Sequence, residues 1–332
     1  MRHTPANNIV DISVIIVNYR SWKHLKNCLE SLKKIEQDEF SFEVIIVDNN
    51  SNDNQLNHFL DNFPDFKFVQ NTGNYGFSNG NNLGESIAKG TFLLFLNPDT
   101  IVSTHALNVL IKQAKEYDDY GIMACTKLNN DGKPEKEIRF FPKLSTLLGI
   151  SRVLHRLANK QRINLKYSTD KLTVFPDWVS GSIIFMSRKW FEKINGWNED
   201  YWLYLEDVDL CKRITNAGGK VALTRQTHII HNHGGASRLN VKTAALTKAE
   251  VIISKHVYIN THFKGASKIC AQIILFFSVC ITKLVLAFLG LILFFIPKLF
   301  LNTLLFRNII LYYFNVCVHR TWMSKRAPNY NR

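Results

Sequence analysis

The last quarter of the chain lacks acidic residues. Glu250 is the final acid, and residues 251–332 hold ten Lys and Arg without one Asp or Glu. This stretch is also strongly apolar, but Lys283, Lys298 and Arg307 interrupt it, so no uncharged run reaches the ~18–20 residues of a simple membrane-spanning helix. A basic, apolar, acid-free segment is typical of contact with an anionic membrane surface. Nucleic acid is not an expected partner, because its binding surfaces are basic and polar rather than apolar.

Three arrangements of this tail stay open. In one, a helix lies in the membrane interface, because several polar side chains fall within roughly a 140° arc of a helical wheel. These are Lys268, Gln272, Ser278, Thr282 and Lys283. Leu284–Ile296 is apolar all round, so a hairpin that enters the bilayer and turns at Pro297-Lys298 is the second arrangement. The third is a dimerising helix pair.

Paired cysteines, a secretory signal and a dinucleotide fingerprint are also missing. The six cysteines show no CxxC spacing, so we expect reduced thiols, as in a cytoplasmic protein. The opening MRHTPANNIVD has no apolar stretch like that of a secretory signal. No GxGxxG follows the first β-branched run, which argues against a Rossmann-type dinucleotide oxidoreductase.

What the chain does contain is an alternation of short apolar runs and amphipathic segments. We expect strands over Ile12–Val17, Phe42–Val47, Phe66–Val69, Phe92–Leu96, Val179–Met186 and Val221–Leu223. We expect helices over Trp22–Lys33, Asn54–Asn62, Asn82–Lys89, Ala106–Lys115 and Leu205–Ala217, the last with an outward-facing Asp209–Arg213 pair. This order predicts an α/β fold with a doubly wound, mostly parallel sheet flanked by helices. Residues 129–176 are irregular, and we interpret them as an insertion or lid over the sheet edge.

Acidic and histidine side chains follow the expected strands. Asp48 ends the second strand and Asp99 the fourth, while Glu206-Asp207 begins a helix and His231 follows later. Ligands of open α/β sheets bind beyond the carboxyl ends of the strands, so these side chains are expected to face one crevice. Each also has an ordinary structural explanation, such as a turn at Asn97-Pro98-Asp99 or favourable charge at a helix N-terminus.

Seven segments within residues 10–240 stand in a characteristic order. They are VIIVNYRS (14–21), VDNNSND (47–53), NYGFSNGNNLG (74–84), FLNPDT (95–100), WVSGS (178–182), LYLEDVDLCKR (203–213) and HNHGGAS (231–237). Together they resemble family 2 glycosyltransferases with the GT-A fold, and most of all the rhamnosyltransferase-like branch. The resemblance implies a GT-A domain over residues 1–245, followed by a basic, hydrophobic helical region for membrane association over residues 246–332.

The resemblance also implies a donor site. Asp48 would recognise the nucleotide base. Gly76 and Gly80 would allow close backbone approach in a loop that lines the donor pocket, and Asn82 would hydrogen-bond to the donor. Asn97 stands where many relatives have the first Asp of a DxD motif, and its amide oxygen could face the metal or the ribose.

A divalent cation, Mg²⁺ or Mn²⁺, is the implied cofactor. Asp99 matches the last carboxylate of the DxD motif and would bind the cation through the diphosphate of the donor. His231 would complete the site, with His233 as the alternative, because the HNH spacing does not separate them. Asn97 in place of Asp removes one charge and is expected to weaken metal affinity.

Asp207 matches the catalytic base of the family. A sugar hydroxyl that attacks an anomeric carbon must lose its proton, and a carboxylate within hydrogen-bond reach is the usual acceptor. Glu206 is the second candidate if the helix register turns it inward. Residues expected near the acceptor are Trp178 and Gly181-Ser182, with Tyr201, Trp202 or Tyr204 either stacking on a sugar or packing in the core.

The implied function is inverting transfer of a sugar from a nucleotide-sugar donor to a hydroxyl of a lipid-linked or cell-envelope glycan. L-Rhamnose is the leading candidate sugar, and UDP-hexoses come next. The expected partners are the nucleotide sugar, a lipid-linked glycan acceptor and the membrane surface, at the cytoplasmic face of the inner or plasma membrane. The alternative is a non-catalytic nucleotide-sugar-binding or scaffold protein of a polysaccharide assembly complex. Asn97 motivates that alternative, and the intact Glu206-Asp207 pair argues against it.

Overall fold

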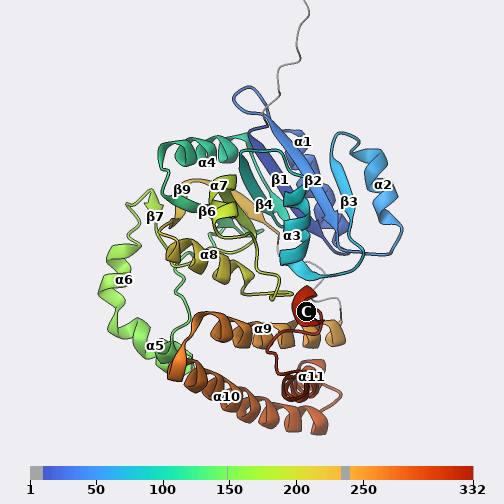
Figure 1. The fold of residues 1–332 in the computed structure, drawn as a ribbon, viewed down its shortest axis with the longest axis vertical. Coiled ribbons are helices and arrows are strands. Elements are labelled where there is room, and N and C mark those ends of the chain that lie inside the picture. Colours follow the sequence, from blue (N-terminus) through green and yellow to red (C-terminus); the bar gives the residue numbers. More distant parts are fainter. Residues whose placement is uncertain (1–9, 148, 233–239, 332) are drawn as a thin grey trace, which may run out of the picture.

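The computed structural model describes residues 10–147, 149–232 and 240–331, and within them one mixed sheet forms the centre of the molecule (Figure 1). Its strand order is β3-β2-β1-β4-β8-β6-β9-β5, with β7 paired to β9. The strands are β1 Ile12–Asn18, β2 Phe42–Asp48, β3 Lys67–Gln70, β4 Phe92–Leu96, β5 Thr100–Ile101, β6 Tyr120–Leu128, β7 Thr173–Val174, β8 Ile183–Ser187 and β9 Lys220–His231. All run in one direction except β5, β7 and β8. The predicted α/β sheet of mostly parallel strands is confirmed.

The helices form two groups. Those around the sheet are α1 Trp22–Lys33, α2 Gln55–Asn62, α3 Gly76–Ser86, α4 Thr104–Glu116, α7 Arg188–Lys193 and α8 Glu206–Asn216. The others are α5 Gly149–Ala158, α6 Lys160–Lys166, α9 Val241–His262, α10 Gly265–Ile292 and α11 Pro297–His319. In Figure 1, α9, α10 and α11 lie together below the sheet, and α5 and α6 run along one side from the sheet edge toward them. The irregular segment of residues 129–176 therefore includes this α5–α6 arm.

The central strands form because their β-branched and aromatic side chains suit a sheet that is covered on both faces. Every residue of β1 and β4 is buried. Helix α1 covers the sheet with Leu25, Leu29 and Leu32, which share one face at helical spacing. The ends of β1, β2 and β4 are thereby held at one edge of the sheet, where the polar residues of the next loops begin.

Helix α3 begins at Gly76, six residues earlier than the sequence predicted. The prediction of a glycine-rich loop over residues 74–84 was wrong. A Cβ added to Gly80 would lie 2.8 Å from Val17, and one added to Gly84 would lie 2.5 Å from Ile15. These glycines therefore let the helix pack closely on β1, and this close packing outweighs the weak helix propensity of glycine.

A glycine is required at position 76 by the backbone conformation there and by the atoms that surround it. Its φ is +89°, and an added Cβ would lie 2.1 Å from the carbonyl oxygen of Trp202. We expect Gly76→Ala to lower the free energy of unfolding by more than Gly132→Ala, for which φ is +71° but nothing lies within 4 Å of the added Cβ. The control change should cost about 1–2 kcal/mol for the left-handed backbone alone. Thermal unfolding of both variants checks this, and equal losses would contradict the proposed clash.

A second hydrophobic core joins the sheet domain to the C-terminal helices. Tyr201, from the segment that leads into α8, and Val208, from the first turn of α8, pack with side chains of α9, α10 and α11. The hydroxyl of Ser254 in α9 also donates to the carbonyl of Leu203 at 2.8 Å. The boundary between residues 245 and 246 stays a prediction, but α9 is packed directly against the start of α8.

Helices α10 and α11 form an antiparallel hairpin. Phe276 packs against Tyr313 with ring centroids 4.7 Å apart, and near the other end the Thr303 hydroxyl donates to the Ala287 carbonyl at 2.9 Å. The turn covers residues 293–296, and Pro297 begins α11 at a position where its missing N–H is not needed. Both helices are long and apolar enough to cross a membrane.

The outer face of α10 is apolar along most of its length. Ile269, Ile273, Phe277 and Ile281, spaced by four residues, are each exposed by half or more. On the opposite side, Gln272 is buried and donates to the backbone carbonyl of His256 in α9 at 3.0 Å. The expectation that Gln272 belongs to a water-facing polar arc was therefore wrong, because this side of the helix packs on α9.

Candidate active site

The pairing of β5 with β9 brings Asp99 and His231 together. Thr100, next to Asp99, is in register with His231, and the N–H of Asn232 donates to the Asp99 carbonyl at 2.8 Å. The His231 Nε2 atom lies 3.4 Å from Asp99 Oδ1. Two residues that are 132 positions apart in the sequence thus face each other, as the sequence predicted for a shared site.

Glu135 stands behind His231 and was not identified from the sequence. Its Oε1 lies 2.6 Å from His231 Nδ1, and its Oε2 lies 2.8 Å from Lys127 Nζ. Burial opposes ionisation of Glu135, but Lys127 and His231 outweigh it and lower its pKa to about 2. Burial disfavours the charged form of His231 as well, yet Asp99 and Glu135 outweigh it and raise the pKa.

The Asp99–His231 pair has donor atoms suitable for a divalent cation. Asp99 Oδ1 is buried and accepts no hydrogen bond from the residues the structure describes. A carboxylate oxygen facing an imidazole nitrogen suits Mn²⁺ well, and such a cation usually shares its remaining coordination with substrate phosphates and water. Across the described ranges, no three His, Cys, Asp or Glu side chains form a metal cluster by themselves. His233, the alternative ligand, lies outside the described residues.

Asp207 lies in the first turn of α8, and its carboxylate is held by backbone. Its Oδ2 accepts the N–H of Gly181 at 3.0 Å. The two residues before the helix, Tyr204 and Leu205, have φ of 71° and 62°. Left-handed backbone at such residues costs about 1–3 kcal/mol each and is found mostly at functional sites. The strain sets where α8 begins and therefore where Asp207 points.

The two adjacent acids of α8 lie in different environments. Glu206 is 7% exposed, and burial together with the charge of Asp207 raises its pKa well above the usual range. Asp207 is half-buried, and burial raises its pKa too, although the Gly181 N–H and the charges of Arg139 and Lys127 oppose the shift. Lys127 also pairs with Glu135, so Asp207 and the Asp99–His231 pair lie on two sides of one cation.

Asp209, the third acid of this turn, is bound by other side chains inside the protein. It is fully buried, with Oδ2 2.7 Å from Arg213 Nε and Oδ1 2.7 Å from His262 Nε2 of α9. Arg213 also donates to the carbonyl oxygens of Ile194 and Gly196. The Asp209–Arg213 pair predicted at i,i+4 therefore forms, but it lies inside the protein, because α9 covers this face of α8.

The structure places two of the predicted donor-site residues in internal contacts. The buried Asp48 carboxylate accepts hydrogen bonds from the Asn18 amide at 3.0 Å and from the Ser51 N–H at 2.9 Å. The Asn82 amide bonds to the Trp197 backbone and to Glu199. These contacts hold the ends of β1 and β2 and fix α3 to the turn before α8. Direct donor contacts of Asp48 and Asn82 stay predictions.

Gly76 and Asn97 also flank the strand ends. The Gly76 carbonyl accepts the side-chain N–H of Asn49 at 2.8 Å, which joins the start of α3 to the loop after β2. The backbone of Asn97 bonds to Ser182 and Thr100, and within the described chain its side-chain amide makes no hydrogen bond. Asn97 is therefore able to turn its amide toward a ligand at this edge, and its role there stays a prediction.

A cleft of about 550 Å³ opens beside Asp207, between residues 136–147 and helices α9 and α10. Trp178 and Tyr204, two of the residues expected near the acceptor, line it, and so does Ser180, whereas Gly181 and Ser182 are not among its lining residues. Tyr201 does not line it either, because it is fully buried in the second core, and stacking of this ring on a sugar is excluded. The site thus has a general-base candidate next to a cleft, and at the strand ends a carboxylate–histidine pair whose donor atoms suit a divalent cation.

This combination of fold and site is that of a glycosyltransferase, and the comparisons with known proteins agree. The family model described as glycosyl transferase family 2 matches residues 13–194, and the model described as the N-terminal domain of galactosyltransferase matches residues 162–233. Because the first match covers more than half of the chain, the protein belongs to glycosyl transferase family 2. It is a nucleotide-sugar-dependent glycosyltransferase.

Three relatives of this chain are named as two rhamnosyltransferases and a hexosyltransferase. Rhamnosyltransferase WbbL of Escherichia coli is 29% identical over 66% of this chain and 83% of its own length. The N-acetylglucosaminyl-diphospho-decaprenol L-rhamnosyltransferase of Mycobacterium tuberculosis is 24% identical over 67% of this chain and 76% of its own. A low-salt glycan biosynthesis hexosyltransferase of Haloferax volcanii is 28% identical over 67% of each chain.

Two solved structures share the fold. GalNAc-T7, solved with UDP, GalNAc and Mn²⁺, aligns with a TM-score of 0.54 at 16% identity, over 76% of this chain and half of that chain. Residues 1–349 of S. aureus TarS align with a TM-score of 0.50 at 18% identity, over 78% of this chain and 68% of that chain. At these identities the likeness supports the fold and leaves the substrates undetermined.

Proposed function

We propose that this protein transfers L-rhamnose, with inversion, from a nucleoside diphosphate sugar to a hydroxyl of a lipid-linked glycan. The observation that carries the proposal is the position of Asp207, held by the Gly181 N–H at the edge of a cleft and next to the strand ends. The names of two relatives support rhamnose, and the name of the mycobacterial one supports a polyprenyl diphosphate acceptor.

The proposed chemistry is a single displacement. Asp207 accepts the proton of the acceptor hydroxyl as that oxygen forms a bond to the anomeric carbon and the bond from carbon to the diphosphate oxygen breaks. The Gly181 N–H donates to Oδ2 and the Val208 N–H donates to Oδ1 at 2.8 Å, so both carboxylate oxygens are held in place. Each oxygen keeps a further lone pair that can accept the proton. Because the attack comes from the face opposite to the leaving group, the product has inverted configuration without a covalent enzyme intermediate.

Asp99 and His231 would hold a divalent cation at the leaving group. Such a cation neutralises the charge that develops on the diphosphate. Glu135 orients His231 through Nδ1, which directs Nε2 toward Asp99. Lys127 neutralises Glu135, so the site does not accumulate uncompensated negative charge when the cation is absent.

The test of this function is nucleotide release from a donor panel of dTDP-rhamnose, UDP-glucose, UDP-galactose, UDP-N-acetylglucosamine and GDP-mannose. Each donor is assayed with Mg²⁺, with Mn²⁺ and with EDTA, using membrane extract as the acceptor source. Metal-dependent release from dTDP-rhamnose that the extract stimulates is the expected result. Release from another donor would refute rhamnose. Binding without release from every donor would instead favour the non-catalytic scaffold.

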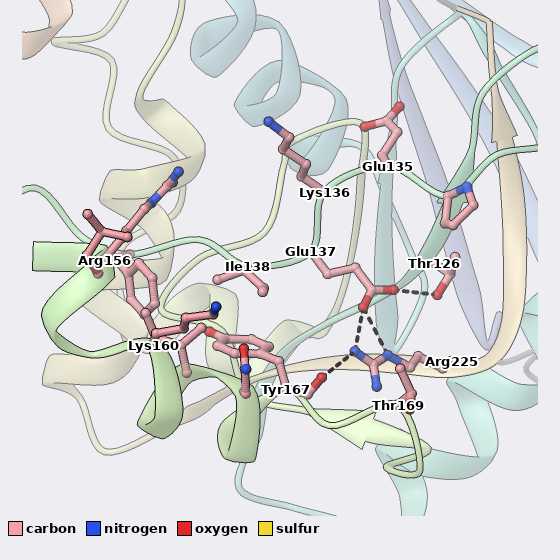
Figure 2. Close-up of a pocket in the computed structure, with 15 residues that line it drawn as sticks. Thr126, Glu135, Lys136, Glu137, Ile138, Arg156, Lys160, Tyr167, Thr169 and Arg225 are labelled. Carbon is pink, nitrogen blue, oxygen red and sulfur yellow. Dashed lines mark hydrogen bonds and ion pairs between the residues drawn. The ribbon is translucent and has the colours of Figure 1, made fainter. Parts of the chain in front are cut away.

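Glu135→Gln is expected to weaken Mn²⁺ binding about 10- to 100-fold, the usual effect of removing the carboxylate behind a metal-binding histidine. Titration of Mn²⁺ against donor binding measures the change. Glu137→Gln is the matched control, because Glu137 is two residues away and pairs with Arg225 and Thr126 instead (Figure 2). Equal effects of the two changes would contradict the role of Glu135.

We also propose that the α10–α11 hairpin binds the protein to the cytoplasmic face of a membrane. Replacing Ile273, Phe277 and Ile281 with Ser should abolish binding to phospholipid vesicles, since each exposed apolar side chain contributes about 1.5–3 kcal/mol when buried. Vesicle flotation measures this. The control replaces the exposed Leu60 and Ile87 of the sheet domain. Retained flotation of the triple variant would rule out this face of α10 as the membrane contact.

A further inference from the structure

The cleft beside Asp207 contains far more positive than negative charge. Its cationic side chains are Lys136, Arg139, Lys143, Arg156 and Lys255. Its acids are Glu206 and Asp207, which lie together at the start of α8. Because Glu206 is buried with a strongly raised pKa, Asp207 is the main negative charge that these cations face. An anionic group would therefore be stabilised in the part of the cleft away from Asp207.

The wall opposite the sheet domain is apolar and belongs to the C-terminal helices. Ile259 from α9 and Leu275 from α10 line it, together with Leu147 from the segment before α5. Leu275 lies on the inner side of α10, the helix whose outer side is the exposed apolar face. The cleft thus connects the catalytic carboxylate to the helix proposed to meet the membrane.

Lys255 and Arg139 line the cleft from different elements. Lys255 is on α9, while Arg139 comes from the segment after β6 and lies over the Trp178 ring, 4.4 Å from its centroid. Trp178 is fixed in turn by a hydrogen bond from its Nε1 to the Phe140 carbonyl at 3.1 Å. Lys136 and Arg156 also border a neighbouring cavity of about 770 Å³ that Figure 2 shows, so cations are present on both sides of Ile138.

We infer that this cleft binds the diphosphate of a prenyl-diphosphate-linked acceptor, with Lys255 and Lys143 contacting the phosphates and the α9–α10 wall contacting the first prenyl units. The inference rests on the proposed function, since it places the acceptor sugar at Asp207. The side chains that line the cleft suit such a molecule, because they combine the base Asp207, five cations and apolar residues of α9 and α10.

The test is direct binding of farnesyl diphosphate to the full-length protein in detergent, measured by calorimetry without any donor. Lys255→Glu and, separately, Lys143→Glu should each weaken binding roughly 10- to 100-fold, as expected for removing a charge-assisted hydrogen bond. Lys242→Glu makes the same charge change on an exposed position of α9 outside the cleft and should change binding by less than about twofold. Thermal unfolding confirms that each variant is folded.

Three competing ligands show which part of farnesyl diphosphate the protein recognises. Farnesol, which lacks phosphate, should not displace farnesyl diphosphate, and inorganic diphosphate should displace it only at much higher concentration. Phosphatidylglycerol vesicles should not displace it at all. Displacement by the vesicles, or unchanged affinity in both cleft variants, would overturn the inference. Because no sugar is transferred in this experiment, its outcome is independent of whether rhamnose is the donor sugar.

Discussion

Replacing Asp207 with asparagine is expected to reduce sugar transfer by about 10²–10⁴-fold, the usual contribution of a general base. The asparagine keeps the size of the side chain and its oxygen can still accept the Gly181 N–H, while only the hydrogen bond from the Val208 N–H to Oδ1 is lost. Donor binding should stay nearly unchanged, because the Asp99–His231 pair belongs to other elements. Transfer rates and nucleotide binding, measured on the same preparation, check the prediction.

Glu206→Gln is the matched control. Burial and the charge of Asp207 raise the pKa of Glu206 and so favour its uncharged form, which glutamine matches in size and charge. We expect transfer within a few-fold of the natural protein. If Glu206→Gln abolished transfer while Asp207→Asn retained it, the base would be Glu206 instead.

The pH dependence of the transfer rate is a second test of Asp207 as the general base. The base must be ionised to accept a proton, and burial raises its pKa above the ordinary value. Transfer should therefore rise with pH as Asp207 ionises, with the acidic limb at a higher pH than for a solvent-exposed aspartate. This limb should disappear from the residual rate of Asp207→Asn.

Asp209→Ala is expected to lower the free energy of unfolding by about 3–5 kcal/mol, the cost of removing one partner from a buried ion pair. The change leaves the Arg213 guanidinium and the His262 ring without their shared carboxylate. Because His262 belongs to α9 and Asp209 to α8, the loss should also loosen the contact between the catalytic helix and the C-terminal helices. Urea unfolding measured in detergent gives the magnitude.

Lys220→Ala is the control for this second prediction. Lys220 pairs with Asp119, but both side chains are at least half exposed, and such surface pairs contribute less than about 1 kcal/mol. A loss for Asp209→Ala as small as that for Lys220→Ala would show that Asp209 does not stabilise the junction between α8 and α9.

Local pattern was sufficient for several elements of the first hundred residues. Trp22–Lys33 and Phe92–Leu96 were predicted with the bounds the structure has, because helical spacing and short apolar runs arise within single segments. The positions of Asp99, His231 and Asp207 at the ends of elements followed from the same patterns. Only the pairing of β5 with β9 shows that two of these residues face each other.

Other features depend on contacts that no local pattern reveals. The strand Tyr120–Leu128 was not predicted, and the helix Val241–His262 was expected only as part of a helical region over residues 246–332. Residues 76–81 of the helix Gly76–Ser86 were assigned to a loop, because glycine and asparagine usually indicate one. Packing on β1 overrides that preference. No sequence motif surrounds Glu135, so the sequence did not identify it. Glu135 contacts His231 only because of the path that the chain takes after β6.

The sequence by itself determined the class of this protein, an α/β glycosyltransferase with a basic, apolar C-terminal region, because motif order, strand pattern and charge distribution are properties of the chain. The tertiary structure alone decided which acid of the Glu206–Asp209 turn is available for chemistry. Glu206 is buried, with its pKa raised, and Asp209 is buried and paired with His262 of α9, whereas Asp207 in the cleft is only half-buried. The three acids lie in one turn, and only the helices packed around it place them in different environments.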